Sequence, residues 1–421
     1  MKIRLRTLLI AAVIAILSLL AAANAFSFAL GFPDEFEYWA LAENLVRTGT
    51  FSFDGVHPSA SRPPLVAWVL TPFVAAGLPM AAARPWFVLF FAASGILAGW
   101  LLCRLFPDST AGPVVGTAFV LAHPIYLFSA GNLYPQQILV PLLLATFALA
   151  ILTPATIAGT IARSVGIGLL TAASMLATAP AIFALLPVFL LLAWQDLRAL
   201  RRRQYQRAVQ ALIAVAALTL CLAPWFARNS RNVHPGIYLT LNSGTNLLLG
   251  NAPATTPTSG VHVDLSAWAP VRADESEVEM NRRHTQAAVD NIRGNPGYYA
   301  RLYLRKFAAG FSNTVETVTH GYNKRATLVF SSYMALVWIG TGILLFRIFR
   351  RSGAIDARLP VLALLVLTGF VCTVAGYAIF FFRLRFRLPA DVSLALVAAA
   401  GWELARASLA QRKTRTQRAA D

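Results

Sequence analysis

The residues best suited to chemistry in this chain are two adjacent carboxylates, Asp34 and Glu35, which follow its first long apolar segment. Ionisable groups at membrane depth are costly, so such a pair often marks a site. A carboxylate held near the membrane surface can act as a general base, and partial desolvation would raise its pKa towards a useful range. The alternative is that both acids only begin a helix after Pro33, where they favour the helix dipole.

A second candidate group consists of three arginines, Arg383, Arg385 and Arg387, which alternate with apolar residues. In an extended segment this alternation would place all three side chains on one side. Guanidinium groups bind phosphate through paired hydrogen bonds, so the group predicts a site for the phosphate or pyrophosphate of a lipid. The alternative is a general attraction to anionic headgroups.

A third candidate region is rich in asparagine and follows an apolar segment that ends near residue 226. Its polar candidates are Arg228, Asn229, Asn242, Asn246 and Asn251. Asparagine and glycine in tight turns present amide hydrogen bonds of the kind that sugar hydroxyls require, but both are also ordinary turn residues. The six histidines are scattered singly and the three cysteines lack CxxC spacing, so neither a metal site nor a cofactor is predicted, and dependence on a divalent metal stays open.

The composition indicates what must position these residues. Hydrophobic residues make up 57% of the 421 residues and charged residues only 13%, which predicts an all-α polytopic membrane protein. The net charge of +18 would suggest nucleic acid in a soluble protein. Here the basic residues cluster between apolar segments, which is typical of topology determinants and of contacts with membrane lipids, so nucleic acid is not an expected partner.

Four basic clusters, within 2–6, 198–207, 347–358 and 406–418, should all be cytoplasmic. An even number of crossings must then separate them, which favours about ten transmembrane helices with both termini in the cytoplasm. The apolar stretch from Pro63 to Met80 would make the number odd, so we expect it to lie along the membrane without crossing. The first segment resembles either a signal peptide or a retained anchor, and its length favours the anchor.

This topology divides the chain into six parts. They are a first transmembrane helix (1–32), an external loop with juxtamembrane helices and the acidic pair (33–84), a transmembrane bundle (85–226), a large external loop (227–325), a C-terminal transmembrane bundle (326–406) and a basic cytoplasmic tail (407–421). Outside the membrane, helical patterns are expected at 34–48, 276–293 and 298–311.

Taken in order, several motifs resemble the polytopic membrane glycosyltransferases of the GT-C class, specifically bacterial relatives of protein O-mannosyltransferases and of the aminoarabinose transferase that modifies lipid A. The matching parts are Asp34-Glu35, Arg62-Pro63-Pro64-Leu65, Pro224-Trp225 with Arg228-Asn229, the stretch 242–253, Asn295-Pro296 before Tyr299 and Lys306, and Arg385-Phe386-Arg387-Leu388-Pro389. No single motif is specific, but their order extends over nearly the whole chain.

The resemblance implies a GT-C-like bundle in the inner membrane that takes a sugar from a polyprenyl-phosphate donor and transfers it externally, with inversion, to a lipid, glycan or protein. It implies that Asp34 is the general base, that Glu35 orients the base or the acceptor, that Arg62 lies near the donor phosphate and that Lys306 belongs to the substrate loop. The chain departs from relatives at Gln136 and Gln137, where they often carry an acid.

Two other functions remain open from the sequence. A transporter or flippase for lipid-linked saccharides would use the same arginines without bond chemistry, and a noncatalytic assembly protein would use the 227–325 loop. Transporters commonly place charged or broken helices near the membrane midplane. Here the apolar segments are nearly free of charge and the ionisable residues gather on one side, which favours the transferase.

Overall fold

The structure is a computed structural model that describes residues 2–27, 32–205, 208–237, 239–266, 268–270, 272, 275–313, 324–350 and 355–420. Within these ranges all regular structure is helical, as predicted. Parts of two basic clusters (206–207 and 351–354) and of the expected external loop (314–323) lie outside them.

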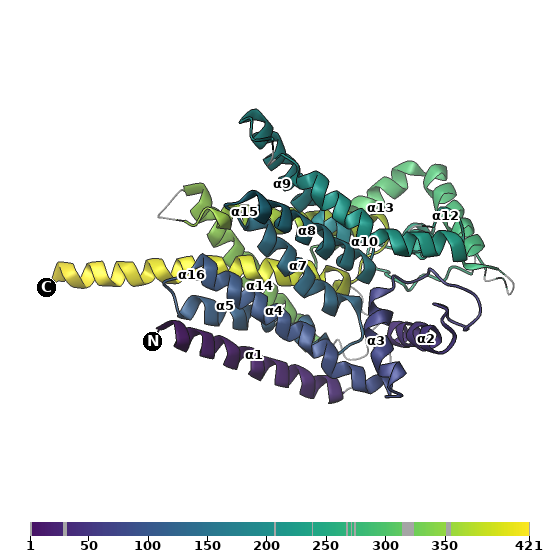
Figure 1. The fold of residues 1–421 in the computed structure, drawn as a ribbon, viewed down its shortest axis with the longest axis horizontal. Helices are drawn as coiled ribbons and strands as arrows, with labels where there is room; N and C mark the ends of the chain where they lie inside the picture. The colour runs from purple at the N-terminus through teal and green to yellow at the C-terminus, as the bar shows by residue number, and fades with distance from the viewer. Residues whose placement is uncertain are drawn as a thin grey trace.

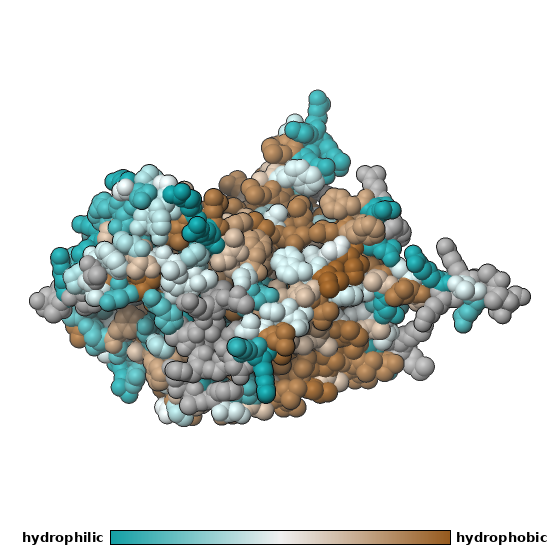
Figure 2. All heavy atoms as spheres, turned by 180° about the vertical axis from the view of Figure 1, so that it is seen from behind, coloured by the Kyte–Doolittle hydropathy of each residue, from teal (hydrophilic) through white to brown (hydrophobic). Residues whose placement is uncertain are grey.

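Among the described residues, eight helices are long and apolar enough to cross a membrane, so the chain is a multi-pass integral membrane protein. They are α1 (Lys2–Ser27), α4 (Arg84–Leu105), α8 (Ile157–Ala177), α9 (Ala181–Arg201), α10 (Gln210–Asn232), α14 (Lys324–Arg350), α15 (Arg358–Ile379) and α16 (Leu384–Ala420). Figure 2 shows the apolar belt that these helices present, with hydrophilic residues gathered at the two ends.

Two of the expected transmembrane segments are shorter than the rest. One is broken at His123-Pro124 into α5 (Ala111–Leu121) and α6 (Pro124–Ser129), and the other is α7 (Pro135–Ile151). At 1.5 Å per residue α7 is about 25 Å long, slightly less than the hydrocarbon core. Fourteen of its 17 residues are buried, which places it inside the bundle. The number of ten crossings depends on these segments and stays a prediction.

The remaining helices gather at one end of the bundle (Figure 1). They are α2 (Pro33–Thr48), α3 (Leu65–Ala75), the 3₁₀ turn η1 (Met80–Ala83), α11 (Ser243–Asn251), α12 (Glu277–Gly294) and α13 (Pro296–Ala309). Helix α3 has 11 residues and is therefore about 16 Å long. It is too short to cross a bilayer, in agreement with the expected non-crossing role of 63–80.

Local sequence explains where the predicted external helices begin and end. Helix α2 starts at Pro33 with Asp34 and Glu35 in its first turn, and it stops at Gly49, whose φ of 73° suits a left-handed cap. Helix α12 begins with a capping box between Ser276 and Glu279. These signals set where α2 begins and ends and where α12 begins, and α2 carries the acidic pair.

Helix α16 runs through the centre of the bundle, with α5, α7, α14 and α15 against it (Figure 1). Small residues allow this approach: a Cβ on Gly401 would lie 1.9 Å from the carbonyl oxygen of Gly340 in α14. The first turn of α16 lies at the same end as α2. This packing brings the C-terminal arginines to the acidic pair.

Candidate active site

Asp34 lies where three distant segments of the chain meet. Its Oδ1 is 3.0 Å from a guanidinium nitrogen of Arg62, and its Oδ2 is 2.6 Å from one of Arg385. The Asp34 side chain is 20% exposed, so water still reaches it. The structure thus brings together one predicted carboxylate and two of the predicted arginines at the end of the bundle that carries α2.

Arg62 is held between two carboxylates of the same helix. Its Nε donates to Oε2 of Glu37 at 2.7 Å, and its guanidinium lies over the ring of Tyr38 at 5.7 Å. Sequence reasoning missed Glu37, although its place one helical turn after Asp34 was an available signal. Burial raises the pKa of Tyr38 to about 12, so its hydroxyl is neutral at physiological pH.

Arg385 and Arg383 add positive charge on the other side of Asp34. The Arg385 guanidinium lies 4.7 Å from the ring centre of Tyr134, the residue before α7. None of the ion pairs formed within the described ranges includes Arg383, and burial together with Arg385 lowers its pKa to about 10. Arg383 is therefore a cation without a carboxylate partner there, beside a carboxylate that already has two arginines.

These charges decide the protonation state of Asp34. Burial raises the pKa of its carboxyl, but Arg385, Arg62 and Arg383 oppose that effect and hold the pKa below its usual value. The expectation that desolvation raises this pKa is wrong, because the neighbouring cations outweigh it. Asp34 is a carboxylate at neutral pH and becomes an available proton acceptor once its arginines engage another anion.

Glu35 points away from Asp34, into the protein. It is fully buried, and its Oε1 accepts a hydrogen bond from the backbone nitrogen of Leu133 at 3.0 Å. Adjacent residues on a helix project about 100° apart, which separates the two carboxylates. Glu35 therefore joins α2 to the turn before α7. With no exposed atom, it cannot contact an acceptor in this state.

Arg387 does not share a face with Arg383 and Arg385, because Leu384 begins a helix where an extended segment was expected. Its Nε lies 2.9 Å from Asp391, one turn further along α16, and its other nitrogens donate to the carbonyl oxygens of Gly310 and Ser312 and to Asn313. The side chain is 1% exposed. Arg387 therefore anchors the 310–313 segment and is unavailable to a donor phosphate.

The asparagine-rich region is a helix, α11, where a turning loop was expected. Asn251 is buried, and its amide donates to the carbonyl oxygens of Leu247 and Ile379, so it holds the two segments together. Asn242 begins the helix, and Asn246, one turn later, is half-buried. The preceding residue, Leu241, donates to Ala60 at 2.8 Å, which places this segment beside the one that carries Arg62.

Two further basic candidates hold the backbone together. Arg228 donates to the carbonyl oxygens of Ser59 and Phe51, and its neighbour Asn229 is buried. Lys306 is buried, with its Nζ 2.9 Å from the carbonyl oxygen of Gly250 and 2.7 Å from that of Phe380. Burial lowers the pKa of Lys306 to about 8. Both side chains hold backbone segments near the site together, and neither forms an ion pair with Asp34 among the described residues.

Gly250 allows the contact on which this support depends. A Cβ there would lie 1.8 Å from the carbonyl oxygen of Phe380, so Gly250→Ala should separate α11 from the end of α15. We expect a loss of stability of about 1–3 kcal/mol, measured as a lowered thermal unfolding midpoint. Gly297→Ala is the control, because nothing lies within 4 Å of its Cβ position. Equal midpoints for the two variants would contradict this account.

Among the described residues, no group of three or more histidine, cysteine, aspartate or glutamate side chains is placed to hold a metal ion. The chemistry available at the site is that of the carboxylates of Asp34 and Glu37, several guanidinium groups and neutral tyrosines.

Two solved structures of ArnT from Cupriavidus metallidurans are similar to this chain. The structure bound to undecaprenyl phosphate has a TM-score of 0.44 and 15% identity, covering 95% of this chain and 79% of that one. The apo structure has a TM-score of 0.41 and 17% identity, covering 93% and 77%.

No family model and no curated protein matches the chain. Both similarities extend over nearly the whole of this chain at low sequence identity. At this identity and TM-score the likeness identifies neither the catalytic residues nor the substrates. The chain is therefore a multi-pass membrane protein similar in its helical arrangement to ArnT.

Proposed function

We propose that this protein is a membrane glycosyltransferase that moves a sugar from a polyprenyl-phosphate donor to an acceptor hydroxyl. The observation that carries the proposal is the Asp34 carboxylate between Arg62 and Arg385, with Arg383 nearby and lacking an ion-pair partner among the described residues. Two carboxylates, Asp34 and Glu37, beside three guanidinium groups match a reaction that needs a proton acceptor and a site for a departing phosphate.

In the proposed reaction the donor phosphate binds Arg383 and Arg385. That contact draws Arg385 away from Asp34 and frees the carboxylate, which Arg62 continues to orient. The acceptor oxygen then attacks the anomeric carbon and its proton passes to Asp34, while the bond between that carbon and the phosphate oxygen breaks. The electron pair of the broken bond stays on the phosphate oxygen, and the guanidinium groups stabilise the negative charge that the leaving polyprenyl phosphate gains.

The proposed topology places this site on the external face. Ten crossings, formed by the eight long helices together with α5–α6 and α7, would leave both termini and the basic clusters in the cytoplasm. The six-part division of the chain belongs to the same proposal. Asn242 and Asn246 remain candidates for sugar contacts, since Leu241 pairs with the segment before Arg62.

The direct test is a transfer assay with the full chain in proteoliposomes that contain polyprenyl-phosphate-linked sugars. The expected result is release of polyprenyl phosphate together with a glycosylated acceptor. Movement of the intact lipid-linked sugar across the membrane without cleavage would instead identify a flippase, and the proposal would be wrong.

The pH dependence of transfer should respond to Arg385. Because Arg385 is the cation that most lowers the pKa of Asp34, Arg385→Gln should raise that pKa. A base works deprotonated, so the acid limb of the pH profile for kcat/KM should move to higher pH. Arg383→Gln removes the same charge but contributes less to this pKa, so it should shift the limb less. Identical profiles in both variants and the wild type would exclude Asp34 as the titrating base.

A further inference from the structure

A cavity of about 540 Å³ opens where α7 ends, far from Asp34. Helix α7 starts beside Tyr134 and reaches Ile151 about 25 Å away. The walls include Arg104 of α4, Leu149 of α7, Leu152 and Pro154 of the α7–α8 connection, Arg163 of α8 and Arg358 of α15.

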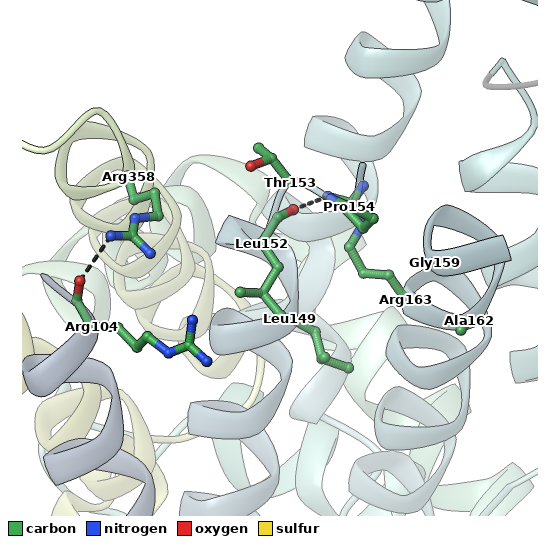
Figure 3. A pocket seen from close by; sticks show the side chains of 9 residues that line it. All are labelled: Arg104, Leu149, Leu152, Thr153, Pro154, Gly159, Ala162, Arg163 and Arg358. Carbon is green, nitrogen blue, oxygen red and sulfur yellow. Dashed lines mark hydrogen bonds between the residues drawn. The ribbon is translucent and has the colours of Figure 1, made fainter. Parts of the chain in front are cut away.

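The cavity is bordered by arginines from three helices. Figure 3 shows Arg104 and Arg358 on one side and Arg163 on the other, with Leu149 and Leu152 between them. A nitrogen of Arg358 donates to the carbonyl oxygen of Arg104 at 2.8 Å, which joins the ends of α4 and α15. Positive charge therefore faces the hollow from both sides, above an apolar floor.

Of the three arginines, Arg163 has the largest free-energy cost of lacking a counter-charge, because it is buried. It is 6% exposed, and its nitrogens donate to neutral acceptors: the carbonyl oxygen of Leu152 and the amide oxygens of Gln195 and Gln210. Asp196 is near enough to act through its charge, but its two oxygens accept backbone hydrogen bonds from Gln210 and Ala211. A buried cation with neutral partners favours a nearby anion.

The carboxylates that pair with the arginines of the cavity do not balance the charge of those arginines. Asp356 pairs with Arg358 at 2.5 Å. Arg104 is exposed, with its guanidinium over the ring of Trp100 at 5.4 Å, and forms none of the ion pairs within the described ranges. Two guanidinium groups, those of Arg104 and Arg163, thus lack a carboxylate contact in the part of the chain that the structure describes.

We propose that this cavity binds the phosphodiester headgroup of an anionic phospholipid. The apolar floor suits the glycerol and upper acyl chains better than it suits a free anion. Next to the cavity, α8 exposes Ile157 and Ile161, by 40% and 41%, to the surrounding lipid. Basic pockets between helix ends are typical headgroup sites. The bound lipid stabilises the ends of α4, α8 and α15 and takes no part in sugar transfer.

The test is thermal unfolding and native mass spectrometry of the full chain in detergent, with added phosphatidylglycerol, phosphatidylcholine or inorganic phosphate. Wild type should retain phosphatidylglycerol and unfold at a higher temperature with it than with phosphatidylcholine. Arg104→Gln should weaken phosphatidylglycerol binding about tenfold, because a charge-assisted contact is lost. Arg104→Lys, which keeps the charge, should retain part of the affinity.

Arg198→Gln is the matched control. Arg198 also lies in the last turn of a long helix, is exposed and stacks on a tryptophan four residues earlier, with 3.7 Å to the Trp194 ring centre, but it does not line the cavity. A second variant, Ala162→Phe, keeps every charge and fills the cavity, so it should also lose the lipid. Equal binding of both lipids, equal loss in Arg198→Gln, or full competition by inorganic phosphate would each overturn the proposal.

Discussion

Asp34→Asn is expected to lower kcat/KM for sugar transfer by about 10²–10⁴-fold, the usual contribution of a general base. The amide keeps the size and shape of the side chain but cannot accept the acceptor's proton. Because Asp34 is partly exposed, its ion pairs with Arg62 and Arg385 should add little to stability. The variant should therefore fold and insert normally, with a thermal unfolding midpoint close to that of the wild type.

Glu37→Gln is the control that separates base catalysis from simple loss of charge. Glu37 also pairs with Arg62 and lies on the same helix one turn further on, but its side chain is 39% exposed. It makes no contact with Arg385 in the described ion pairs. If Glu37→Gln reduces transfer as severely as Asp34→Asn, the loss in both variants comes from a changed orientation of Arg62. Asp34 would then not be the base.

Arg387→Gln is expected to destabilise the protein by about 3–5 kcal/mol, the typical cost of breaking a buried ion pair. The change leaves the fully buried Asp391 carboxylate without its cation, and the carbonyl oxygens of Gly310 and Ser312 lose their donors. Thermal unfolding in detergent is the measurement. The expected result is a much lower midpoint and a reduced yield of folded protein.

A double variant tests whether the loss of stability comes from the unpaired buried charge. In Arg387→Met with Asp391→Leu, both charges are removed from the apolar interior, so the loss should be smaller than in either single variant. Arg385→Gln, two residues earlier, should lower transfer activity while keeping its stability, because Arg385 is part-exposed. Strictly additive losses for the pair, or equal instability of Arg385→Gln, would contradict the separation of the two arginines into a site residue and an anchor.

Local sequence signals were enough to predict three helices outside the long apolar segments. The acids after Pro33 indicated α2, the helical composition from Ser276 indicated α12, and Asn295-Pro296 separated α12 from α13. Such signals need no tertiary context. The high share of hydrophobic residues likewise indicated a membrane protein directly.

The arginine group shows where a local pattern fails. Alternating arginine and apolar residues fit an extended segment, yet Leu384 begins a helix that directs Arg385 towards Asp34 and Arg387 towards Asp391. The contacts that α16 makes inside the bundle favour a helix over an extended segment. No neighbour of Arg387 in sequence indicates that its acceptors lie at 310–313.

The prediction of a turning loop in the asparagine-rich region was wrong for a related reason. Gly244 and Gly250 look like turn residues, but both allow close helix contacts, since a Cβ at either position would lie within 2.2 Å of a backbone oxygen. A glycine used for flexibility and a glycine used for close approach are identical in sequence. The candidate site joins side chains from four distant segments of the chain, those of Asp34, Arg62, Tyr134 and Arg385. No single segment indicates that these side chains lie together.

The burial of α16 has a consequence for how the protein is made. It follows the other described helices in the chain, yet 83% of its apolar window is buried, more than in any other candidate span of the described chain, and it is the least apolar of them. The helices before it are made first, so they must leave a space for α16 between α5, α7, α14 and α15. Arg385 reaches Asp34 only when α16 occupies that space, so the candidate site forms after the helices around it are in the membrane.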